Sequence, residues 1–112
     1  MATTINVMPT EEGTAKVTVS AFTDESGASV TPSAITWTLT DRMGNVINSR
    51  LAVSVTPASS VSFLLTGDDL SIGSNGRQRV ITISATYDSS LGTGLVAREQ
   101  AYFTIEDLTA IT

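Results

Sequence analysis

The amino-acid sequence predicts an all-β protein in which two antiparallel sheets pack as a sandwich. Hydrophobic and polar residues alternate in short runs along the chain, which is the period of half-buried strands. The 112 residues include 18 Thr and 14 Ser but only 15% charged residues, and β-branched Thr favours the pleated surface of a strand. Turn-forming residues separate the runs at short, regular spacing, as in sandwiches and barrels.

The alternation predicts about seven strands. In the clearest run, Ile35, Trp37 and Leu39 share one face and three threonines share the other. The expected strands are Thr4–Met8, Lys16–Phe22, Ala34–Thr40, Arg50–Val55, Ser60–Leu65, Arg79–Tyr87 and Ala101–Ile105. The expected turns are Asp24–Gly27, Asp41–Asn45, Pro57–Ser59, Gly73–Gly76 and Gly92–Gly94. Single helical turns are expected at Gly67–Leu70 and Ile105–Leu108.

Residues 1–112 are expected to form a single domain, because no linker or repeat divides the chain. A chain of this length buries a hydrophobic core without disulfides or metals. The first few residues and the last five are expected to form extended arms that become ordered against a partner.

Composition argues against several classes of function. The net charge of −5 disfavours nucleic-acid binding and docking on anionic membranes. Histidine and cysteine are absent, which excludes Ser-His-Asp and Cys-His triads, thiolate chemistry and histidine-ligated zinc. We therefore expect no enzyme, and assign no catalytic, cofactor-binding or metal-binding residues and no cofactor. The N-terminus lacks the basic start and apolar run of a signal peptide, and we expect synthesis in the cytoplasm.

Two aromatic residues allow a structural and a functional interpretation. Trp37 lies mid-strand with apolar neighbours on its side, which predicts an anchor between the sheets. The alternative is a stacking platform in a carbohydrate binder, which requires an exposed aromatic. Tyr87 lies near the end of a late strand and is interpreted as inward-facing, with a hydroxyl that bonds a nearby backbone group.

Charged residues occur in pairs, which we interpret as structural. The adjacent acids are Glu11-Glu12, Asp24-Glu25, Asp68-Asp69 and Glu106-Asp107. They fit solvated turns better than calcium ligands, because no Asp-x-Asp-x-Asp loop with a distal Glu is present. Arg77 and Arg79 alternate on one face and are expected to form cross-strand ion pairs in the region of Arg98 and Glu99, or an interface salt bridge with a partner protein.

Two segments resemble immunoglobulin-like domains. Residues Ala34–Asp41, followed by Gly44–Ile47, are similar to the strand and hairpin that carry the tryptophan of these domains, and Val80–Tyr87 is similar to the strand that carries their tyrosine. The resemblance covers about half of the chain and departs from antibody domains in lacking both cysteines. It implies an immunoglobulin-like sandwich, while a jelly-roll sandwich would give a similar strand pattern.

The chain as a whole resembles the small virion proteins of tailed bacteriophages. The features that carry this are the Met-Ala-Thr-Thr start, the Ser/Thr-rich strands, the acidic balance, the lack of cysteine and the segment Ala101–Leu108. The resemblance implies a capsid decoration or cement protein that binds the major coat protein, stabilises the shell and is located in the virion after assembly in the host cytoplasm. A homo-oligomer, preferably a dimer, is expected. A tail or neck component and an immunoglobulin-like adhesion or carbohydrate-binding module are the alternatives.

Overall fold

The computed structural model describes residues 2–5 (backbone), 9, 12–20, 22–73 and 76–107. Seven strands lie within these ranges, together with η1, one turn of 3-10 helix at Gly67–Leu70. The strands are β1 (Ala2–Ile5), β2 (Thr14–Ser20), β3 (Ala34–Thr40), β4 (Val53–Val55), β5 (Val61–Thr66), β6 (Gln78–Ser89) and β7 (Gly92–Thr104).

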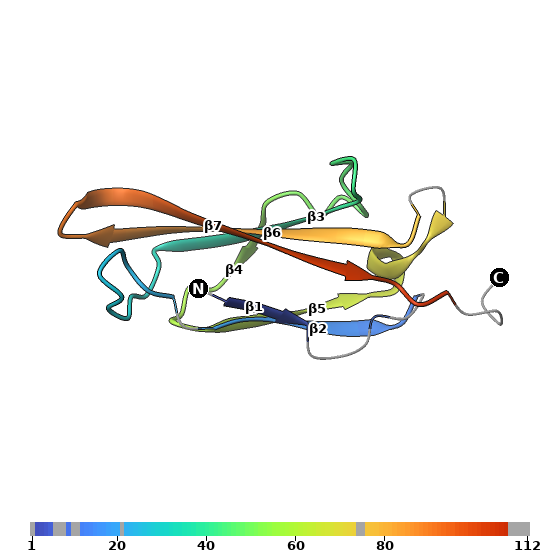
Figure 1. Cartoon of the computed structure of the whole chain (residues 1–112), viewed down its shortest axis with the longest axis horizontal. Helices are drawn as coiled ribbons and strands as arrows, with labels where there is room; N and C mark the ends of the chain where they lie inside the picture. Colours follow the sequence, from blue (N-terminus) through green and yellow to red (C-terminus); the bar gives the residue numbers. More distant parts are fainter. Residues whose placement is uncertain (1, 6–8, 10–11, 21, 74–75, 108–112) are drawn as a thin grey trace.

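The strands form two facing sheets, and every pairing is antiparallel (Figure 1). One sheet has the order β1-β2-β5 and the other β4-β3-β6-β7. This is the strand order of an immunoglobulin constant domain, except that β4 pairs with β3 instead of β5. The predicted all-β sandwich is confirmed.

The alternation seen in the sequence places one face of each central strand in a shared core. On β3, Ile35, Trp37 and Leu39 are at most 3% exposed. Trp37 stacks on Phe63 of β5 in the opposite sheet, with ring centroids 4.4 Å apart and planes at 8°. The predicted role of Trp37 as an anchor between the sheets is therefore confirmed, and its burial rules out a stacking platform. The other buried core residues are Ala15, Val17, Val19, Phe22, Ile47, Val61, Leu65, Leu70, Ile81, Ile83, Ala85 and Ile105.

The predicted strand Arg50–Val55 was wrong in its first half, because β4 contains residues 53–55 alone. The alternation of this segment would place Leu51 on the same face as Val53 and Val55, but Leu51 is 66% exposed. Asn48, Ser49 and Ala52 all have positive φ, a conformation incompatible with a strand. The amide of Ala52 donates to the Thr38 hydroxyl at 2.9 Å instead of joining a ladder.

The β6–β7 hairpin is longer than the sequence predicted. Its turn lies at Ser90 and Leu91, whereas Gly92–Gly94, expected to be the turn, belongs to β7. Gly94 has a φ of +65° where the register shifts by one residue, and its amide donates to Asp88 Oδ1 at 2.9 Å. The predicted strand Ala101–Ile105 is thus the last part of a strand that begins at residue 92.

The predictions for the first strand and for the two helical turns had different outcomes. The expected strand Thr4–Met8 overlaps β1, which begins at Ala2, and residues 6–8 lie outside the described residues. The expected helical turn Ile105–Leu108 was wrong for residues 105–107, which form no helical turn. The Ile105 amide donates to the Arg77 carbonyl, and the Glu106 amide donates to the Pro9 carbonyl. The helical turn at Gly67–Leu70 is confirmed.

The Trp37–Phe63 stack yields a stability prediction. We expect Trp37→Ala to lower the free energy of unfolding by about 3–5 kcal/mol, since it removes a large buried aromatic from between the sheets. Tyr102, which is 71% exposed, provides the control, and Tyr102→Ala should cost less than about 1 kcal/mol. Urea denaturation measures both, and a loss below about 1 kcal/mol for Trp37→Ala would contradict the assigned role.

Candidate docking surface

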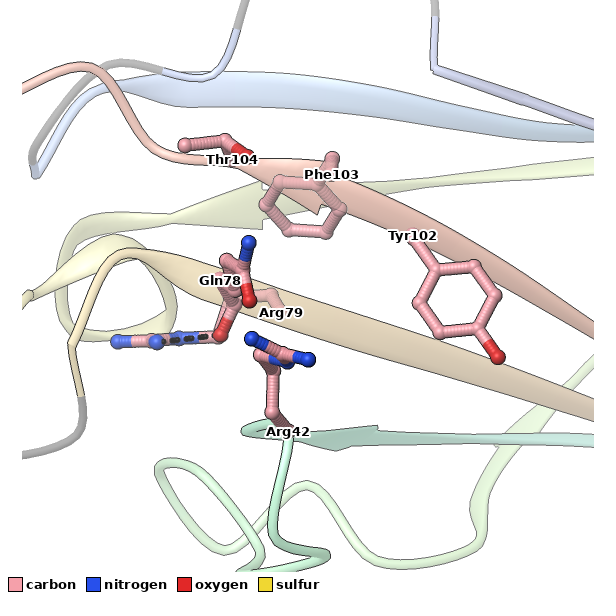
Figure 2. A pocket seen from close by; sticks show the side chains of 6 residues that line it. All are labelled: Arg42, Gln78, Arg79, Tyr102, Phe103 and Thr104. Atoms are coloured by element: carbon pink, nitrogen blue, oxygen red, sulfur yellow. Dashed lines mark hydrogen bonds between the residues drawn. The ribbon is translucent and has the colours of Figure 1, made fainter.

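A shallow hollow of about 300 Å³ lies at one end of the four-stranded sheet (Figure 2). It is lined by Arg42, Gln78, Arg79, Tyr102, Phe103 and Thr104. In Figure 2 the guanidinium of Arg42 points toward Gln78, and the Tyr102 ring stands to one side of them. Three separate segments contribute: the loop after β3, the start of β6 and the end of β7.

The loop that carries Arg42 is held by Asp41, which confirms the predicted turn Asp41–Asn45. The Asp41 Oδ1 accepts hydrogen bonds from the backbone amides of Met43 and Asn45 at 2.8 and 3.0 Å. Gly44 takes a φ of +88°, which glycine adopts without steric cost. The buried Asp41 thus fixes the turn and leaves Arg42 and Met43 exposed at its tip.

Positive charge gathers here although the chain is acidic overall. A second hollow of about 500 Å³ shares Arg42 and Gln78 with the first and is also lined by Arg77 and Met43. Arg42 makes no hydrogen bond or ion pair with any described residue, while Arg77 Nε donates to the Ile105 carbonyl at 2.8 Å. Two exposed arginines and an exposed methionine therefore face solvent in adjoining hollows, a combination suited to an acidic, partly apolar partner surface.

Arg79 lies beneath this surface and does not form the predicted cross-strand ion pair. It is 1% exposed, and its Nη atoms donate to the carbonyls of Ser71, Gly76 and Gln78 at 2.7–2.9 Å. Burial lowers its pKa, and the nearby Asp41 carboxylate acts in the opposite direction. The prediction failed because Arg79 lies opposite Phe103 in the register, far along β7 from Arg98 and Glu99; Arg98 instead donates to the Ser84 hydroxyl at 3.2 Å.

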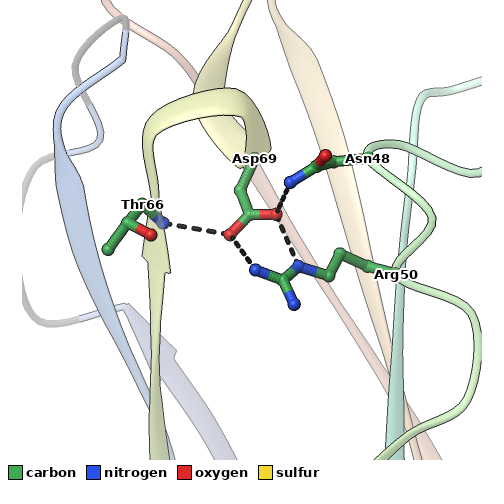
Figure 3. Close-up of polar contacts among 4 residues, drawn as sticks. All are labelled: Asn48, Arg50, Thr66 and Asp69. Carbon is green, nitrogen blue, oxygen red and sulfur yellow. Dashed lines mark hydrogen bonds and ion pairs between the residues drawn. The ribbon is translucent and has the colours of Figure 1, made fainter.

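An ion pair joins Arg50 to Asp69 (Figure 3). Arg50 Nε lies 2.7 Å from Asp69 Oδ1, and Nη2 lies 3.2 Å from Oδ2. The carboxylate also accepts hydrogen bonds from Asn48 Nδ2 at 2.9 Å and from the Thr66 amide at 3.0 Å. Asp69 is fully buried, so its interpretation as a solvated turn acid was wrong, whereas its neighbour Asp68 is exposed.

The Asp69 cluster connects the two sheets. Asp69 follows β5 of the three-stranded sheet, while Asn48 and Arg50 belong to the loop between β3 and β4 of the other. The Arg50 guanidinium also lies 5.7 Å from the centre of the Trp37 ring, within cation–π range. Burial raises the pKa of Asp69, but the hydrogen bonds from Arg50, Asn48 and Thr66 outweigh it, and the pKa lies below its ordinary value.

The sequence analysis did not single out the exposed Tyr102, and it predicted a hydrogen bond for Tyr87 that the structure does not contain. Alternation around the inward-facing Phe103 places Tyr102 on the outer face, so this signal was present in the sequence. Tyr87 is half-buried, and its hydroxyl makes no hydrogen bond with any described residue, so the expected bond to a nearby backbone group is not found.

Within the described ranges, no group of three or more acidic, histidine or cysteine side chains is placed to hold a metal ion. No helix of the described part of the chain is long and apolar enough to cross a membrane.

Comparison with known proteins identifies no relative: no family model, curated protein or solved structure matches this chain.

The Asp69 cluster yields a pH-dependent stability prediction. We expect Asp69→Asn to lower the free energy of unfolding at neutral pH by about 3 kcal/mol, the lower end for breaking a buried pair, because the Arg50 side chain remains 36% exposed. The folded protein holds the Asp69 pKa below its unfolded value of about 4. The stabilisation is thus present above that unfolded value and is lost as pH falls through the folded pKa.

Denaturation of both proteins across acidic pH tests this, with Asp68→Asn as the matched control on the exposed neighbour. The difference in the free energy of unfolding between wild type and Asp69→Asn should shrink as the pH falls. The free energy of unfolding of Asp68→Asn should remain close to that of wild type throughout. A difference that stays constant down to the acid limit of folding would show that the ionised carboxylate is not the stabilising group.

Proposed function

We propose that the protein is a non-enzymatic structural protein of a bacteriophage virion, a capsid decoration protein that docks on the coat-protein shell. The observation that carries the docking role is the gathering of exposed Arg42, Arg77 and Met43 around adjoining hollows of an otherwise acidic molecule. The virion assignment rests on the resemblance of the sequence to small phage proteins. A rigid sandwich with exposed loops and strand edges fits a docking role that requires no chemistry.

The occupancy of phage particles tests this assignment. We expect mass spectrometry of gradient-purified particles from the source strain to find the protein at a copy number comparable to that of the coat protein. A few copies per particle would transfer the assignment to the tail or neck. Its absence from particles would overturn the virion role, without affecting the sandwich itself.

The docking surface is tested by charge reversal. We expect Arg42→Glu to weaken rebinding to particles that lack the protein by about tenfold, the equivalent of about 1.4 kcal/mol. Lys16→Glu makes the same change of charge at an exposed position of the other sheet and should rebind like wild type. Equal losses for the two variants would indicate a general charge effect and contradict a docking site around Arg42.

An immunoglobulin-like carbohydrate-binding module is the second candidate, because Tyr102 is 71% exposed beside Arg42 and Gln78. Exposed aromatic rings with adjacent polar groups suit sugar binding. A glycan array supports this candidate if a glycan binds the wild type and fails to bind Tyr102→Ala. An array without binding removes it.

A further inference from the structure

The strand β7 leaves the longest unpaired sheet edge in the described structure. It extends over 13 residues at the margin of the four-stranded sheet, whereas β4 at the opposite margin has three. No proline interrupts residues 92–104. A sheet edge of this kind presents free N–H and C=O groups to which another strand can add.

The register shows which backbone groups of β7 are free. The Ile105 amide donates to the Arg77 carbonyl at 2.8 Å, in line with the β6–β7 ladder. Bonded and non-bonded pairs alternate in an antiparallel ladder. From Leu95 onward, where the register is continuous, the odd-numbered residues of β7 therefore direct their backbone groups toward β6. The even-numbered residues direct theirs outward, and no further backbone partner for them is found in the described residues. These residues are Val96, Arg98, Gln100, Tyr102 and Thr104, all with exposed side chains.

We propose that β7 pairs antiparallel with β7 of a second copy of this chain, with Gln100 on the twofold axis, so that one sheet of eight strands runs through the dimer. Each Arg98 then lies opposite the partner's Tyr102, an arrangement that allows a cation–π contact. Each Val96 lies opposite the partner's Thr104. All five outward-facing residues thereby gain a partner with free backbone groups.

Charge selects this register over its neighbours. Centring the pair on Glu99 sets two carboxylates directly opposite each other, and centring it on Arg98 does the same with two guanidinium groups; both arrangements are destabilising. Centring it on Ala101 shortens the paired segment. Pairing even-numbered with odd-numbered residues sets free groups against groups already bonded to β6, and forms no ladder.

The dimer would place the docking surfaces of its two chains on the same side. Directly opposed residues of an antiparallel pair project to the same face, so the outer faces of both four-stranded sheets remain on one side. The two hollows around Arg42 are then displayed in the same direction, related by the twofold axis. A dimer that carries two such sites binds a repeating surface with avidity. The dimer itself rests on the β7 edge alone and holds or fails independently of the proposed function.

Cysteine crosslinking in the full-length protein tests the edge and the register together. The chain has no native cysteine, so a single introduced one reports a single contact. The two Gln100 residues would form a hydrogen-bonded pair of the antiparallel ladder, in which the Cα atoms lie about 5.5 Å apart. This distance is within the range that a disulfide spans. We expect Gln100→Cys to form a covalent dimer under mild oxidation, and Arg98→Cys, four residues from its counterpart, to remain uncrosslinked. Efficient crosslinking of Arg98→Cys, or none with Gln100→Cys, would overturn the register.

Charge variants at the exposed residues Tyr102 and Arg98 provide an independent measurement. Light scattering at rising protein concentration should show the wild type reaching twice the mass of one chain. Tyr102→Arg sets a second guanidinium group opposite the partner's Arg98 and should weaken dimerisation by about tenfold. Adding Arg98→Glu to it creates an opposite-charge pair and should restore dimerisation. A monomer at every concentration, or a double variant no better than the single one, would overturn the proposal.

Discussion

The structure depends on one buried carboxylate and the aromatic stack beside it. Asp69 accepts hydrogen bonds from Arg50 and Asn48 of one sheet's loop and from the Thr66 amide at the end of the other sheet's strand. Arg50 in turn lies over Trp37, which stacks on Phe63 across the core. A chain of polar and aromatic contacts thus joins the two sheets without the disulfide that performs this role in antibody domains.

The same cluster explains the irregular loop before β4. Asn48, Ser49 and Ala52 take positive φ values, which cost conformational free energy in residues other than glycine. The hydrogen bonds of Asn48 and Arg50 to a fully buried anion offset that cost. The loop in turn holds the Arg50 guanidinium within reach of Trp37. Local backbone strain and contact between the sheets are therefore two aspects of one arrangement.

The sequence predicted the parts of the fold that local periodicity determines. Strand β3 was predicted with its correct bounds, and the burial of Trp37 followed from its neighbours Ile35 and Leu39. Contacts distant in sequence were out of reach. Asp69 resembled any turn acid, because Arg50, its partner, lies 19 residues away. Arg79 was predicted to form an ion pair, because its actual acceptors are backbone carbonyls that only the folded end of the sandwich brings together.

The candidate docking surface was predictable only in part. The turn at Asp41–Asn45 and the outward face of Tyr102 are both visible in the sequence, but their meeting beside Gln78 depends on the strand order. The length of β7 was also hidden, because glycines at 92 and 94 suggest a turn when read alone. The long edge and the cationic hollows thus emerge from the topology and together define a surface suited to assembly.

Residue-resolved amide hydrogen exchange at several protein concentrations tests most directly whether the β7 edge is the element that assembles. Pairing predicts that the amides of Arg98, Gln100 and Tyr102 become protected as concentration rises, while those of Glu99 and Ala101, already bonded to β6, are protected throughout. Fast exchange at Arg98, Gln100 and Tyr102 at every concentration would contradict an edge-paired dimer.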